Sequence, residues 1–213
     1  MKKLKSKWIS KNPENRLYHM PVPIIGLTGG IGTGKSTVSD ILLKKNIAVI
    51  DADKLVKNIY ILPETLEFVS KHFPLAFQNG SIDFTKLREI VFADPSAKKS
   101  IEDFIYAYLP SEFKKAYEKL NSPLFIVYDV PLLFEKKLDE KVDLTVCVYA
   151  KRETQIERLV SRDKSSLQLA DNILASQMDI DEKKGKANLV IDNQNNLETL
   201  NLSIEQFLRD IID

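Results

Sequence analysis

Eight consecutive residues constrain this chain more than any other feature. Residues 29–36 read Gly-Gly-Ile-Gly-Thr-Gly-Lys-Ser and match the pattern G-x-x-x-x-G-K-[ST]. An apolar run at residues 22–28 precedes them, and residues 35–45 carry apolar side chains at helical spacing. This order predicts a strand, a glycine-rich turn and a helix, which is the local structure in which the pattern binds phosphate.

The chemistry of this segment predicts a cradle for nucleotide phosphates. Gly29 and Gly34 permit backbone angles that a side chain disfavours, so the N–H groups of the loop converge on phosphate oxygens at a helix N-terminus. Lys35 is expected to reach the β- and γ-phosphates, and the Ser36 hydroxyl to bind Mg²⁺. Thr37 is either a phosphate ligand or a helix-start residue. The predicted nucleotide-binding residues of the cradle are Gly29, Gly30, Ile31, Gly32, Thr33, Gly34, Lys35, Ser36 and Thr37.

Four further short apolar runs predict the rest of a parallel sheet. They lie at residues 47–50, 123–128, 142–149 and 188–192, and helical patterns separate or follow them. Continuously apolar strands of this length are typical of a sheet that helices cover on both faces. The expected fold class is α/β, with a five-stranded parallel sheet.

The pattern changes between residues 63 and 121, where apolar residues recur at helical spacing and no central strand is evident. We interpret residues 63–121 as a helical insert in a core formed by residues 21–62 and 122–213. Residues 1–20 are basic and polar and lack the apolar run of about 7–15 residues that a secretory signal needs. We interpret them as a mobile extension.

Composition argues against several classes of protein. The 31 Lys and Arg residues balance 30 Asp and Glu residues to a net charge of +1, which gives no drive toward nucleic acid or acidic membrane. No stretch approaches the roughly 18 apolar residues of a membrane span. The single cysteine, Cys147, is expected to be a buried side chain, and with two histidines it forms no zinc-ligand cluster. A cytoplasmic setting is expected.

Acidic residues follow two of the predicted strands. Asp51 and Asp53 come after the second strand and Asp129 after the third. Ligands of parallel α/β sheets bind at the carboxyl ends of strands, so these carboxylates are expected to share an edge with the cradle. There a carboxylate can take or orient the proton of an acceptor hydroxyl, and Asp129 suits a Mg²⁺–water contact. The alternative is a helix cap or turn residue, and for Asp51 both interpretations stay open.

Two arginines, Arg158 and Arg162, are four residues apart on a predicted helix and therefore share a face. Arg162 precedes the polar loop predicted at residues 163–166. Enzymes that transfer phosphoryl groups often neutralise the developing charge with arginines on a mobile flap. From spacing alone the alternative is a solvated helix face, with pairing to Glu157 or Asp163.

Several segments beyond the cradle have a particular sequence. The cradle itself is common to many nucleotide-binding proteins. Two segments are far more particular, Val49-Ile50-Asp51-Ala52-Asp53 and Asp129-Val130-Pro131-Leu132-Leu133-Phe134-Glu135. Further particular residues, in order along the chain, are Val91-Phe92, Asp94-Pro95, Gln155, Arg158, Arg162-Asp163, Gln177-Met178 and Val190-Ile191-Asp192-Asn193. With these segments in this order, the sequence from Ile24 to the last helix resembles the dephospho-coenzyme A kinase family.

The resemblance implies a P-loop kinase fold with a helical acceptor-binding insert and a lid at about residues 158–182. It implies ATP-dependent phosphorylation of the ribose 3′-hydroxyl of dephospho-CoA, with Mg²⁺ as the second cofactor. Residues implied to be catalytic are Lys35, Asp53, Arg158 and Arg162. Asn193 is implied to lie near the adenine of ATP. Acceptor contacts are implied for Asp53, Asp129, Leu132 and Leu133, and metal contacts for Ser36 and Asp129.

Three positions depart from the family's pattern. A Leu-His-Pro signature is replaced by Ile105-Tyr106-Ala107, an Arg by Phe84, and an Ala-Asp by Ala187-Asn188. The first two lie in the insert, so they concern acceptor contacts and leave transfer from ATP intact. A related P-loop kinase that acts on a different nucleotide-like acceptor is therefore the alternative function.

The sequence argues against two other classes of protein. A GTP-dependent switch is disfavoured because the chain has no Asn-Lys-x-Asp run and no Asp-x-x-Gly after the third strand. A non-catalytic binding module is disfavoured by the retention of Lys35, Ser36, Asp53, Asp129 and Arg162.

Overall fold

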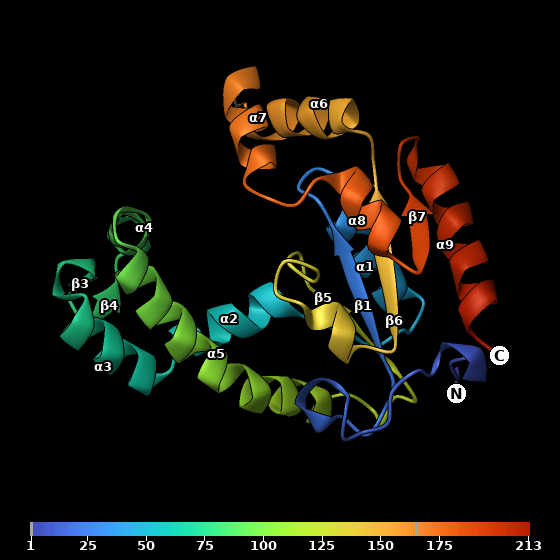
Figure 1. Cartoon of the computed structure of the whole chain (residues 1–213), viewed down its shortest axis with the longest axis horizontal. Coiled ribbons are helices and arrows are strands. Elements are labelled where there is room, and N and C mark those ends of the chain that lie inside the picture. Colours follow the sequence, from blue (N-terminus) through green and yellow to red (C-terminus); the bar gives the residue numbers. More distant parts are fainter. Residues whose placement is uncertain (1, 165) are drawn as a thin grey trace. The chain divides into compact units, whose positions relative to one another are not determined.

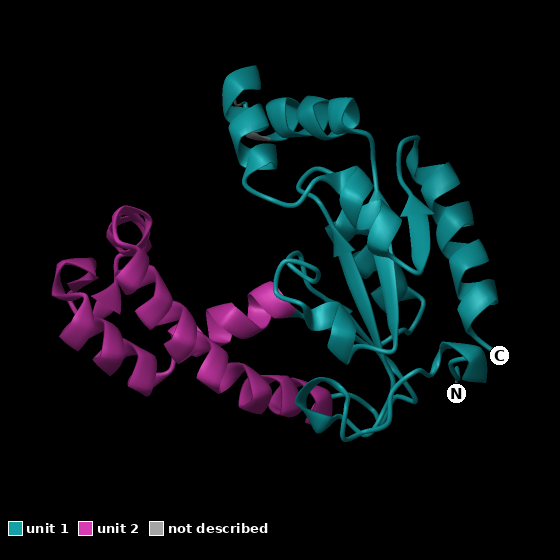
Figure 2. Cartoon of the chain, in the orientation of Figure 1, with its two compact units in different colours: residues 1–51, 120–213 teal, residues 52–119 magenta. Residues whose placement is uncertain are grey.

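The structure, a computed structural model, describes residues 2–164 and 166–213, without the side chain of Asp163. Two compact units are present (Figure 2): unit 1 is the chain up to Asp51 and from Leu120 onward, and unit 2 is Ala52–Lys119. Unit 2 begins at Ala52 and not at the predicted residue 63, because helix α2 (Ala52–Tyr60) packs against the long helix α5 (Pro95–Glu118).

Unit 1 is built on a five-stranded sheet in the order β2-β5-β1-β6-β7, with every neighbouring pair parallel. Figure 1 labels four of these strands, β1, β5, β6 and β7. The strands are β1 (Ile24–Gly29), β2 (Val49–Asp51), β5 (Ile126–Asp129), β6 (Leu144–Tyr149) and β7 (Leu189–Asp192). The five strands predicted from apolar runs are confirmed. Because β1 is central, the loop that follows it lies in the middle of the sheet's carboxyl edge.

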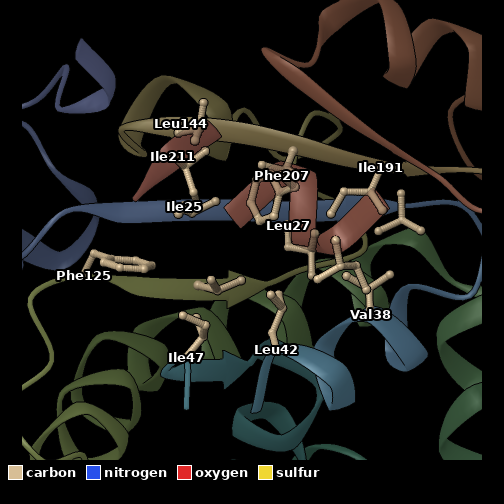
Figure 3. Close-up of a cluster of buried hydrophobic side chains, with 14 of the residues drawn as sticks. Ile25, Leu27, Val38, Leu42, Ile47, Phe125, Leu144, Ile191, Phe207 and Ile211 are labelled. Atoms are coloured by element: carbon tan, nitrogen blue, oxygen red, sulfur yellow. The ribbon is translucent and has the colours of Figure 1, made fainter. Parts of the chain in front are cut away.

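Helices cover both faces of this sheet. On one face, α1 (Lys35–Lys44) and α9 (Leu197–Ile211) bury apolar side chains against the strands, as Figure 3 shows for Val38, Leu42 and Phe207. On the other face, α8 (Ile180–Lys186) packs over Cys147 and Tyr149. Successive residues of β6 therefore enter opposite cores, which is the period-two pattern of a strand.

Burial raises the pKa of the Cys147 thiol to about 12, so the thiol stays protonated.

Two helices beyond β6 form a small core of their own within unit 1. Helices α6 (Arg152–Asp163) and α7 (Leu167–Ala175) meet at a buried cluster that Ile31 of the cradle also contacts; its buried members are Leu159, Ala170 and Leu174. The predicted loop at residues 163–166 falls partly on Ser165, which lies outside the described residues; Ser166 caps α7.

Unit 2 consists of α2, α3 (Pro63–His72), α4 (Phe84–Ala93), α5 and a two-stranded hairpin, β3 (Phe77–Gln78) with β4 (Ser81–Ile82). Its core includes stacked rings of Phe68 and Phe104, whose centroids are 4.1 Å apart. The hairpin was not predicted, because strands of two residues show no periodicity.

No helix in the described part of the chain is long and apolar enough to cross a membrane.

The N-terminal extension packs on unit 1, so the prediction of a mobile extension is wrong. Leu4 is buried and forms a bridge with Ile212, and the short 3₁₀ segments Ser6–Trp8 and Leu17–His19 follow it. Arg16 is also buried, with Nε 2.7 Å from Oδ2 of Asp143. The apolar contact and the ion pair join segments far apart in sequence, which explains why local composition did not reveal them.

Candidate active site

The cradle lies where the sequence predicts it, between β1 and α1. Gly32 and Gly34 have φ values of 78° and 84°, a left-handed conformation that favours glycine. Thr33 is buried, and both its N–H and its hydroxyl donate to the Gly30 carbonyl, at 3.2 and 2.8 Å. The loop therefore holds a tight turn at the N-terminus of α1.

Arg158 and Asn193 hold the cradle by its carbonyl oxygens. Arg158 Nη1 donates to Gly32 O at 3.2 Å and to Thr33 O at 3.4 Å, and Nη2 donates to Asn193 O at 2.8 Å. Asn193 is buried, and its Nδ2 donates to Thr33 O at 2.7 Å. A trans peptide points its C=O and N–H in opposite directions, so binding Thr33 O directs the Gly34 N–H away from Arg158. Arg158 thus contacts the cradle backbone in this structure, a role that its spacing did not indicate.

Lys35 and Asp129 form a buried ion pair beside the cradle. The Lys35 ammonium contacts Asp129 Oδ1, and Ser39 Oγ donates to Asp129 Oδ2 at 2.5 Å. Asp129 is 4% exposed, and a carboxylate so buried is stable only with such partners. Both of its oxygens are bound by side chains of α1, an arrangement that the predicted Mg²⁺–water contact did not anticipate. The contact of Ser39 with Asp129 was not predicted from the sequence. Its only sequence signal is that a polar residue stands beside Val38 in the apolar stripe of α1.

The groups that face solvent at this edge are Ser36, Thr37 and, in part, Asp51. Ser36 and Thr37 are exposed in the first turn of α1, and Asp51 is half-buried in register with Asp129. Among the described residues, no group of three or more His, Cys, Asp or Glu side chains is placed to hold a metal. A Mg²⁺ ion here would need phosphate and water oxygens besides one or two protein ligands, as is usual for this ion.

The remaining predicted residues divide between the two units. Asp53 lies in the first turn of α2, exposed, in unit 2, and two peptide bonds separate it from Asp51 at the end of β2. Arg162 is exposed in the last turn of α6. Leu132 is 37% exposed. Leu133 is fully buried, and a Cβ on Gly26 would lie 2.9 Å from it, so Leu133 packs in the core of unit 1 in this structure.

Comparison with known proteins places this chain among relatives along nearly all of its length. The Dephospho-CoA kinase family model matches residues 23–199. A dephospho-CoA kinase from Fusobacterium nucleatum is 39% identical over 194 residues, which cover 90% of this chain and 100% of that protein. A dephospho-CoA kinase from Helicobacter pylori is 38% identical over 192 residues, covering 88% and 97%.

Solved structures agree with this placement. A Thermus thermophilus protein superposes with a TM-score of 0.80 at 29% identity, covering 89% of this chain and 97% of its own. A dephospho-CoA kinase from Campylobacter jejuni superposes with a TM-score of 0.64 at 27% identity, covering 88% and 96%. The P-loop kinase fold expected from the sequence is confirmed.

Proposed function

Because the chain belongs to the dephospho-CoA kinase family, we propose that it transfers the γ-phosphoryl group of ATP to the ribose 3′-hydroxyl of dephospho-CoA, yielding CoA and ADP. The observation that carries this proposal is the cradle at the centre of the sheet edge, with the Lys35 ammonium held beside it by Asp129. A cation is therefore in place before the nucleotide binds, which reduces reorganisation when phosphate charge arrives.

The reaction needs one bond to form and one to break. The 3′-oxygen of the acceptor attacks Pγ, the bond from Pγ to the β–γ bridging oxygen breaks, and ADP leaves. We assign the acceptor's hydroxyl proton to the Asp53 carboxylate, which supports attack by taking or orienting that proton. We assign Lys35 and Arg162 to neutralising the negative charge on the phosphoryl group during its transfer. Preorganised cations contribute most to catalysis at that point.

Mg²⁺ fits the solvent-facing side of the cradle. The Ser36 hydroxyl is exposed at the start of α1, as the P-loop pattern requires for a metal ligand. Asp51 and Asp129 stand side by side at the ends of β2 and β5, and a carboxylate there can bind a water of the ion. When bound, Mg²⁺ would neutralise phosphate charge.

The departures from the family's pattern in unit 2 bear on acceptor specificity. The departures in unit 2 include an exposed aromatic ring, Tyr106, which offers a stacking surface or a hydroxyl in place of an imidazole. Phe84 is half exposed, and its ring meets Tyr60 edge to face at 5.1 Å between centroids. Aromatic side chains of unit 2 could therefore stack on a nucleotide-like acceptor.

The experiment compares kcat/KM for dephospho-CoA, AMP and adenosine at fixed ATP and Mg²⁺, with release of ADP as the readout. We expect dephospho-CoA to be the best acceptor, because contacts to its long arm hold the 3′-hydroxyl in line with Pγ. Faster turnover of AMP or adenosine would favour the alternative kinase. Release of ADP that no acceptor increases would favour a switch or motor ATPase over a kinase.

A further inference from the structure

Another ion pair of unit 1, between Lys183 and Glu135, has no part in the proposed chemistry. Lys183 of α8 is fully buried, and its Nζ lies 2.8 Å from Glu135 Oε1. The same ammonium donates to the Pro131 carbonyl at 2.7 Å. The pair therefore joins α8 to the segment that follows β5.

One route leads from this pair to the root of the cradle. The Pro131 carbonyl that accepts from Lys183 also accepts from Thr28 Oγ1 at 3.0 Å. Thr28 is buried in β1 and immediately precedes Gly29, the first cradle residue. Lys183 and the root of the cradle therefore share one carbonyl oxygen.

Another route leads to the cradle loop itself. Glu135 Oε1 accepts from the Met178 N–H at 3.2 Å, in the link between α7 and α8. In the same link, Gln177 Oε1 accepts from the Ile31 N–H at 3.1 Å. Gln177 and Met178 also line a small pocket with Gly30. The link is thus bonded to the cradle through Gln177 and to Glu135 through the following residue, Met178.

The pair is not optimised for stability alone. Glu135 Oε2 is buried and has no hydrogen-bond partner in the described part of the chain. A buried polar atom without a partner is destabilising, and apolar residues of similar volume often replace a buried ion pair without loss of stability. The geometry points to a positioning role: we propose that Glu135 and Lys183 hold the link between α7 and α8 so that Gln177 fixes the cradle backbone for ATP.

A purely structural ion pair is the competing explanation, and paired substitution separates the two. Removing one partner would leave a buried charge, whereas Glu135→Leu with Lys183→Met removes both charges and keeps apolar volume. The matched control is Glu205→Leu with Lys45→Met, which removes an ion pair of the same residue types between α9 and the residue that follows α1; this pair is 3.1 Å long and more exposed. The melting temperature of each protein is measured first.

The affinity for ATP is then measured by calorimetry without any acceptor, so the result does not depend on what the acceptor is. We expect the Glu135→Leu/Lys183→Met protein to bind ATP about tenfold more weakly, because small displacements of positioned groups have large effects. The control is expected to match the wild type. Unchanged ATP affinity in the folded Glu135→Leu/Lys183→Met protein would overturn the proposal.

A double-mutant cycle tests whether the pair acts through Gln177. Gln177→Leu alone should weaken ATP binding to a similar extent and increase hydrogen exchange at the Ile31 amide. In that background, replacing the pair should have little further effect, since two changes on one route are not additive. Additive losses would overturn the route. If the paired variant fails to fold, Gln177→Leu still decides, because unchanged ATP affinity in that protein contradicts the proposal.

Discussion

At the scale of single residues, Lys35 and Asp129 show how the cradle is prepared for its ligand. The ammonium is paired in a site where its side chain is 13% exposed, and the carboxylate is bound on both oxygens. An ATP phosphate entering the cradle would give Lys35 a second anionic partner. The Asp129–Ser39 contact would persist, so α1 would stay joined to β5.

Replacing Lys35 with Ala tests this arrangement. We expect kcat to fall by about 10² or more, because a preorganised cation at the transferring phosphoryl group is lost. The measurement is kcat at saturating ATP and acceptor, with the melting temperature as a check of folding. Near-normal kcat in a folded Lys35→Ala protein would contradict the assigned role.

Replacing Asp53 with Asn tests the proposed base. The change keeps the shape of the side chain and removes its charge, so kcat should fall while ATP affinity changes little. The matched control is Asp51→Asn, two residues earlier at the end of β2, which should be milder. Should Asp51→Asn prove the more damaging substitution, the assignment of the base would move to Asp51.

At the scale of elements, α6 carries two arginines whose spacing places them on the same face of the helix but whose surroundings differ in the structure. Arg158 is half-buried and holds three backbone carbonyls, whereas Arg162 is exposed one turn later. The equivalence predicted from their spacing therefore does not extend to their surroundings.

Substituting each arginine with Lys tests whether Arg158 and Arg162 have different roles. Lysine keeps the charge but cannot reproduce the planar fork of a guanidinium. Arg158→Lys should weaken ATP binding and lower the melting temperature, because the Gly32 and Asn193 carbonyls cannot both be held. Arg162→Lys should lower kcat with little change in melting temperature. If Arg162→Lys left kinetics unchanged, the solvated-face interpretation of this residue would be restored.

Local signals predicted most of the elements. The cradle and the five strands could be predicted because a glycine pattern and short apolar runs each consist of neighbouring residues. The Lys183–Glu135 pair and the contact of Gln177 with Ile31 join residues that come together only through the order of the strands. The resemblance implies an acceptor contact for Leu133, and its burial beside Gly26 depends on a contact between distant segments that no local pattern indicates.

At the scale of the whole chain, the two termini of the described chain meet within unit 1. The Lys5 N–H donates to Ile211 O at 2.8 Å, and Trp8 Nε1 donates to Asp210 O at 3.2 Å. The family match covers residues 23–199, so both partners lie outside it. These contacts are at the C-terminal end of α9, and Lys2 Nζ donates to the carbonyl of Lys45, the C-cap residue of α1. Helix α1 begins at the cradle, and its 10 residues span about 15 Å. Residues 2–8, here called the docked segment, therefore lie at the opposite edge of the sheet.

Deleting residues 1–9 should therefore lower stability and spare catalysis. Burial of Leu4, which is 1% exposed, contributes about 1.5–3 kcal/mol on its own. In a chain of this size that corresponds to a decrease in melting temperature of roughly 3–12 °C. Because Arg16 and Asp143 remain paired, the start of β6 should keep its structure. The measurement is the melting temperature with kcat at 25 °C, and Leu4→Ala in the full chain is the control that separates lost packing from lost length. An unchanged melting temperature would show that the docked segment contributes no stability, and a large fall in kcat at 25 °C would show that it influences the distant cradle.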